Sequence, residues 1–179
     1  MGVSKCFKIT LITTPILLGI MVWHGAALKT PTTPAGIIDA EFAATIPRAE
    51  EILLSWQQPL IQHAIYNTYI DFFFLLSYGI FLFAAVFLLA KKLKGGWRTI
   101  GKLVAYAMLL TALLDAIENF GILMLLNGQL NASVIYFTWL FASIKFILVF
   151  LGFVYLLVAG IYFLWFRTRL RSASIKEAI

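Results

Sequence analysis

The sequence predicts an all-α membrane protein: a four-transmembrane-helix bundle with a short extracytoplasmic amphipathic helix between the first two spans. Three observations predict this fold class. The chain has 179 residues, of which 62% are hydrophobic and 12% are charged, whereas soluble domains are about 45–50% apolar and about 25% charged. Four apolar runs are each long enough to cross a bilayer, which takes roughly 20 helical residues. Alternating strand patterns are absent from these runs, so helices must satisfy their backbone groups.

The predicted spans and the segment between the first two form a single integral membrane domain, residues 1–179. The spans cover residues 9–28, 64–90, 101–126 and 132–166, and the outer segment covers residues 29–63. The first run is longer than the 7–15 apolar residues of a typical signal peptide. We therefore expect an uncleaved signal anchor rather than a cleaved leader.

Lysine and arginine residues concentrate at one set of span ends. The net charge of +6 therefore indicates membrane orientation and contact with lipid, not a nucleic-acid partner. By the positive-inside rule both termini are predicted to be cytoplasmic. The residues on the predicted cytoplasmic side are Lys5, Lys8, Lys91, Lys92, Lys94, Arg98, Lys102, Arg167, Arg169, Arg171 and Lys176, against Lys29 and Arg48 on the other side.

The outer segment carries the signals of a short helix. Thr45 suits the N-cap position and Pro47 the first turn. Ile46 and Trp56 share one helical face with Leu53, so we interpret residues 45–56 as an amphipathic helix on the outer interface, with Trp56 as its anchor. We expect residues 36–60 to act as a lid over a polar cavity within the spans, with Asp39, Glu41, Arg48 and Trp56 as the lid residues.

Ionisable residues within the spans are costly at membrane depth and by default mark a functional site. In the third span Asp115, Glu118 and Asn119 fall on one face with Thr111, because helical neighbours recur at three and four residues. In the second span Asp71 and Tyr78 form a similar stripe with Asn67. In the fourth span Lys145 aligns with Gly152 and Ala159, small residues that allow a close helix approach.

Depth follows from the helical rise of about 1.5 Å per residue. Asp115 and Lys145 fall at the same depth, near the middle of the membrane, and are predicted to form an ion pair. Asp71 and Glu118 fall at a shallower depth, nearer the outer side, and lack an evident countercharge. Two carboxylates in one low-dielectric site do not both ionise cheaply, so a proton or a cation is expected between them.

These residues suggest a polar cavity that opens outward and binds a small cation or an amphiphilic ligand. Two other functions remain open from the sequence: a membrane-embedded enzyme acting on a lipid, with Glu118 or Asp71 as general acid or base, and a structural or assembly subunit. The predicted ligand-binding residues are Asp71, Tyr78, Asp115, Glu118, Asn119 and Lys145.

No cofactor is expected. Asp115 and Glu118 have the i, i+3 spacing of helical carboxylate metal sites, and His63 or His24 is available as a nitrogen ligand. Both histidines nevertheless fall at span ends, and no paired-histidine motif occurs, so a metal site is the less favoured interpretation. The single cysteine, Cys6, excludes an intramolecular disulfide and any multi-cysteine metal site.

The pattern resembles a group of uncharacterised bacterial four-helix integral membrane proteins. The matching stretches are 39–42 with 48–53, Tyr69-Ile70-Asp71-Phe72, and 114–119. The resemblance implies a bacterial inner membrane and no particular activity. The emopamil-binding type of four-helix protein, which also places acids in a membrane cavity, is an analogy only. Gly152 and Gly160 suit internal packing and self-association equally, so a homo-oligomer or a larger membrane complex is also open.

Overall fold

The computed structural model describes residues 2–177, with side chains as far as Trp165. The described chain is helical and contains no strand. Its elements in order are α1 (Val3–Gly25), the 3-10 turn η1 (Ala26–Leu28), α2 (Ile37–Glu41), α3 (Ile46–Lys92), α4 (Gly95–Leu126) and α5 (Ala132–Glu177).

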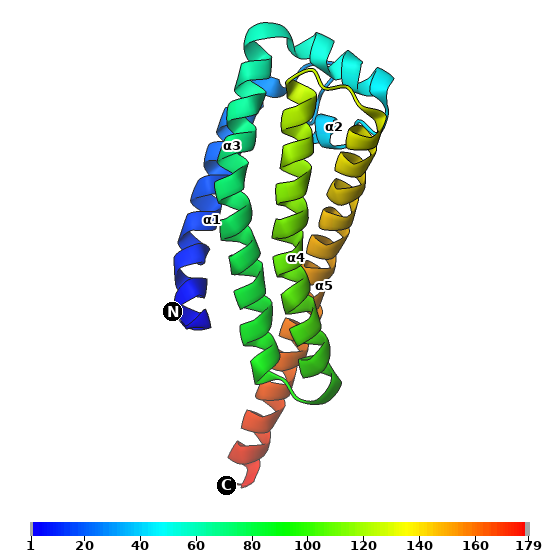
Figure 1. Ribbon diagram of the computed structural model, residues 1–179. Coiled ribbons are helices and arrows are strands. Elements are labelled where there is room, and N and C mark those ends of the chain that lie inside the picture. The colour runs from blue at the N-terminus through cyan, green and yellow to red at the C-terminus, as the bar shows by residue number, and fades with distance from the viewer. Residues whose placement is uncertain (1, 178–179) are drawn as a thin grey trace.

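Four of these helices are long and apolar enough to cross a membrane, which confirms the predicted number of spans. Their candidate membrane segments are Val3–Leu28, Ile46–Lys92, Gly95–Leu126 and Ala132–Trp165. Figure 1 shows the long helices running side by side, with both termini at the end of the bundle opposite α2. The chain thus has the architecture of a multi-pass membrane protein.

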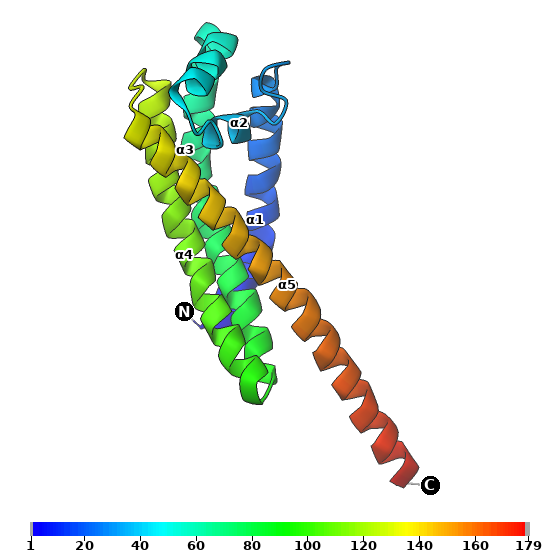
Figure 2. The ribbon, with the colours of Figure 1, turned by 90° about the vertical axis from the view of Figure 1, so that its right-hand side faces the viewer.

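The long helices pack closely where small residues meet. α4 lies against α3 and α5, whereas α1 packs against α3 at the edge of the bundle. Figure 2 shows α5 crossing the bundle obliquely and extending beyond it. Gly152 of α5 lies against the Met108 side chain of α4, as its predicted role requires. One turn further along α4, Ala112 faces Gly79 of α3.

A cap formed by residues 26–56 covers one end of the bundle. The helix predicted after Thr45 is present as the first part of α3, which lies across the end of the bundle in Figure 1. The chain then turns into the membrane-length part of α3 at a kink, where Gln57 has φ 38° and Gln58 leaves the helical region. The position of the predicted amphipathic helix, residues 45–56, on the outer membrane interface stays a prediction.

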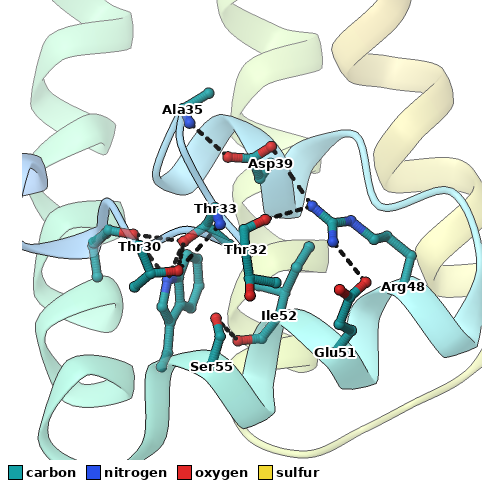
Figure 3. A network of polar contacts seen from close by, with 11 residues as sticks. Thr30, Thr32, Thr33, Ala35, Asp39, Arg48, Glu51, Ile52 and Ser55 are labelled. Atoms are coloured by element: carbon teal, nitrogen blue, oxygen red, sulfur yellow. Dashed lines mark hydrogen bonds and ion pairs between the residues drawn. The ribbon is translucent and has the colours of Figure 1, made fainter.

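Polar contacts hold the cap together (Figure 3). Arg48 Nη2 donates to the carbonyl oxygen of Thr32 at 2.7 Å and lies 3.8 Å from Asp39 Oδ1. Arg48 Nη1 also pairs with Glu51 at 2.6 Å. These groups are partly exposed, so each ion pair contributes at most about 1 kcal/mol. Arg48 therefore joins three segments of the cap to one another.

Trp56 is not the exposed interfacial anchor that the sequence predicted. Its side chain is 1% exposed and its Nε1 lies 3.0 Å from both the Leu28 carbonyl oxygen and Thr33 Oγ1, to which it donates. A buried indole N–H needs such partners. The polar backbone of residues 28–33 offers them, so Trp56 turns inward and becomes the core of the cap.

Replacing Gly79 by alanine tests the close approach of α3 and α4. A Cβ at this position would lie 2.7 Å from the Ala112 Cβ, and overpacking of this kind costs about 1–3 kcal/mol. Gly79→Ala should therefore lower the free energy of unfolding in detergent by that amount. Gly19→Ala is the matched control, because a Cβ at Gly19 meets nothing within 4 Å. Equal effects of the two substitutions would contradict this packing.

Candidate functional site

Lys145 is the centre of a buried group of acids from three helices. Its Nζ lies 2.8 Å from Asp115 Oδ1 and 2.8 Å from Glu118 Oε2, both on α4, and 3.5 Å from Glu41 Oε2 on α2. The side chains of Lys145, Asp115 and Glu118 are 8%, 5% and 0% exposed. The predicted ion pair between Asp115 and Lys145 is confirmed, and Lys145 has two further acidic partners.

α3 extends this group with two polar side chains of its predicted stripe. The Tyr78 hydroxyl donates to Asp115 Oδ2 at 2.8 Å. Asp71 Oδ2 accepts from Asn119 Nδ2 at 2.6 Å, so Asn119 orients a carboxylate as the sequence suggested. Asp71 is thereby joined to the group through Asn119, the residue that follows Glu118 on α4. We refer to Glu41, Asp71, Asp115, Glu118 and Lys145 as the acid–lysine cluster.

Helical periodicity explains most of this convergence. Asp115, Glu118 and Asn119 are all buried because they share the face of α4 that turns into the bundle. Thr111, on the same face, satisfies its hydroxyl locally by donating to the Met108 carbonyl oxygen. Asn67 departs from the predicted stripe, since it lies against Gly25 of α1. The stripe of α3 therefore serves two neighbours: Asp71 and Tyr78 face α4, and Asn67 faces α1.

The cluster contains an excess of negative groups. The cluster holds four carboxylates, half of the eight acids in the chain, and one ammonium group, and three of these carboxylates lie within 3.5 Å of that group. Glu118 shows the imbalance most directly: both of its oxygens are buried and, among the described residues, neither has a hydrogen-bond partner. Its contact with Lys145 is an ion pair without hydrogen-bond alignment. Burying charge without full compensation costs several kcal/mol per ion, so the arrangement is suited to hold a proton or a small cation.

One expectation about the acids is wrong. Glu118 was expected to lack a countercharge, but it lies beside Lys145. The depth estimate assumed straight, parallel helices, and α5 crosses the bundle obliquely (Figure 2). Glu41, predicted as a lid residue, is in addition a direct partner of Lys145. Helical periodicity does not predict this contact of Glu41, because residues 29–45 follow an irregular path that is set by packing within the cap.

The cluster is closed. The described residues show no open cavity beside it. A groove of about 440 Å³ lies elsewhere, on the surface between α4 and α5, where apolar residues form its walls together with Ser133 and Thr138.

The histidines lie away from the acids. The His63 ring stacks on His24 with centroids 3.8 Å apart, and its Nε2 lies 2.8 Å from the His24 carbonyl oxygen. This contact joins α3 to α1. Within the described part of the chain, no group of three or more His, Cys, Asp or Glu residues is arranged to hold a metal ion. The option of His63 completing a site with Asp115 and Glu118 gains no support.

Removing the ammonium group tests whether Lys145 compensates the acids. Lys145→Met should lower the free energy of unfolding in detergent by about 3–5 kcal/mol, because it leaves buried carboxylates without their cation. Adding Asp115→Asn to this variant should recover part of the loss. Lys102→Met, at an exposed lysine of α4, is the control and should have little effect. A loss that Asp115→Asn does not reduce would contradict the electrostatic role.

Comparison with protein-family models, curated proteins and solved structures finds no match for this chain. Three features of the acid–lysine cluster bear on its function: its charge imbalance, its burial, and its connection to the cap through Glu41.

Proposed function

We propose that this protein is an integral membrane protein that binds a small cation, or the cationic head group of an amphiphile, at the acid–lysine cluster. The ligand would reach the cluster from the cap end of the bundle. The observation that carries this proposal is the ratio of four carboxylates to one ammonium group in a buried region. Asp71 and Glu118 would be the principal ligands, since Asp115 already has both a lysine and a tyrosine partner.

Electrostatics favours a cation over an anion or a neutral ligand. If Asp115 and Lys145 neutralise each other, Glu41, Asp71 and Glu118 remain as groups that need protons or positive charge. Attraction between opposite charges is several-fold stronger in a protein interior than in water. Each proton that leaves these acids therefore strengthens the site for a cation, so protons and cations would compete for it.

The closed packing of the cluster also favours a second candidate, a structural role. Lys145 alone connects α2, α4 and α5, and buried ion pairs can fix helix positions without binding any ligand. The two candidates differ in one measurable property. A binding site is stabilised by a particular cation, whereas a purely structural cluster is stabilised equally by every salt at the same ionic strength.

Cation-dependent thermal stability tests the binding role. In lipid nanodiscs, the melting temperature should rise with one of sodium, potassium, ammonium or an alkylammonium amphiphile, relative to N-methylglucamine at matched ionic strength. A ligand at a hundredfold excess over its Kd adds about 2.7 kcal/mol of stability. Glu118→Gln should retain the fold and lose this response.

Glu50→Gln is the matched control, because it removes the same charge from an exposed position of the cap and should retain the cation response. The proposal fails if no cation raises the melting temperature of the native chain. It also fails if Glu118→Gln responds as the native chain does. A Glu118→Gln variant that melts earlier by the same amount in every salt would favour the structural role.

The proposed orientation places the cap outside and both termini in the cytoplasm, in a bacterial inner membrane. It is supported by the concentration of lysine and arginine at the opposite end of the spans and by the position of both termini away from α2 in Figure 1. We expect Cys6, the single free cysteine, to resist an impermeant thiol reagent in intact cells. A Cys6→Ser, Glu50→Cys variant should react, and the reverse pattern would invert the topology.

A further inference from the structure

We propose that α2 is a gate over the acid–lysine cluster, and that Glu41 is both its latch and one of the ligands of the bound cation. This inference rests on the cation-binding role proposed above, because a gate is useful only if a ligand enters the cluster. Three features of α2 support it: a weak contact with Lys145 at its C-terminal end, little buried apolar surface, and unusual backbone conformations on both sides.

The contact between α2 and α5 is the weakest part of the cluster. Glu41 Oε2 lies 3.5 Å from Lys145 Nζ, compared with 2.8 Å for each of the two acids of α4. Glu41 is also more exposed than those acids, with 12% of its side chain accessible. Of the three acidic partners of Lys145, Glu41 is therefore the one that separates most readily.

An aromatic contact lies directly beside this ion pair. The ring of Phe42, which follows α2, packs on Phe146 of α5 with centroids 5.6 Å apart. Lys145 Nζ lies 4.9 Å from the centroid of the same Phe146 ring. Glu41 and Phe42 thus contact consecutive residues of α5 and form one latch, which either closes or opens as a unit.

Little else holds the C-terminal end of α2 against the bundle. Its buried apolar residues are the small Ala40 and, just beyond the helix, Ala43, while Ile37 at the N-terminal end of α2 packs partly buried against the same core. The larger Ile38 and Phe42 are 42% and 39% exposed. Because hydrophobic stabilisation scales with the apolar area removed from water, this segment is held less strongly than the long helices and belongs to the parts of a protein that open first.

Left-handed residues flank α2, and the one that follows it, Ala44, provides the pivot of the gate. Gly36, which precedes the helix, has φ 69°, and Ala44, which follows it, has φ 55°. Left-handed conformations are unfavourable for alanine, so the docked path of residues 37–43 is imposed by its contacts. The N-terminal end stays with the cap, because Asp39 accepts from the Ala35 backbone N–H at 2.7 Å and lies beside Arg48.

These features give the gate a defined movement. Separation of the latch would take Glu41 away from Lys145 and uncover Asp115 and Lys145 from the cap end, while Asp39 remains in place. A cation that binds among the acids would attract the Glu41 carboxylate and so favour the docked position of α2. Binding and closure would then be coupled, because Glu41 completes the site only when α2 is docked.

Thiol accessibility measures the gate without any ligand. Ala142 is fully buried and lies one turn before Lys145 on the same face of α5. In a Cys6→Ser, Ala142→Cys protein in nanodiscs, we expect Glu41→Gln to raise the rate of maleimide labelling about tenfold, the factor that corresponds to about 1.4 kcal/mol. Phe42→Ala should act in the same direction, and Glu50→Gln should leave the rate unchanged.

The outcomes separate the gate from the proposed function. Unchanged labelling in both Glu41→Gln and Phe42→Ala would overturn the gate. Faster labelling, with no slowing of the native rate by any of the tested cations, would retain the gate and overturn the cation-binding role. If Ala142→Cys does not fold, backbone hydrogen exchange over residues 37–44 replaces the label. Exchange that Glu41→Gln does not accelerate would likewise overturn the gate.

Discussion

The rest of this structure depends on one constraint: the positive charge of Lys145 must compensate the buried carboxylates around it. Asp115 and Glu118 lie 2.8 Å from its Nζ in a region of the bundle that excludes solvent. A carboxylate at that depth needs a partner, so α4 and α5 must meet where these side chains coincide. Glu41 adds α2 to the same point. The positions of three helices therefore depend on one ammonium group.

Two kinds of packing surround this point. α3, α4 and α5 approach closely at small residues such as Gly79 and Gly152. These three helices therefore have little freedom to shift relative to one another. α1 is attached differently: the hydroxyls of Thr13 and Thr14 meet Ser77 at 2.7 and 2.9 Å, and few of its side chains are buried. The structure thus combines a tightly packed three-helix core with a peripheral helix and a cap, and the acids lie where the core meets the cap.

The parts of the molecule that follow helical periodicity could be predicted from the sequence. The four spans follow from length and hydropathy, and the pairing of Asp115 with Lys145 follows from their shared depth. Glu41 and Trp56 could not be placed in this way. Their positions depend on the left-handed residues at Gly36 and Ala44 and on the kink at Gln57. None of these features has a regular spacing, and each is determined by contacts between distant segments.

The short connection between α4 and α5, residues 127–131, has a consequence for biogenesis. A lone α5 would bring an uncompensated lysine to the translocon, and each such charge at a helix centre opposes insertion by about 2.5–3.5 kcal/mol. Because the connection is so short, the two segments can emerge as an antiparallel hairpin in which Asp115 already neutralises Lys145. The ion pair between Asp115 and Lys145 would then also lower the free-energy cost of inserting α4 and α5 into the membrane.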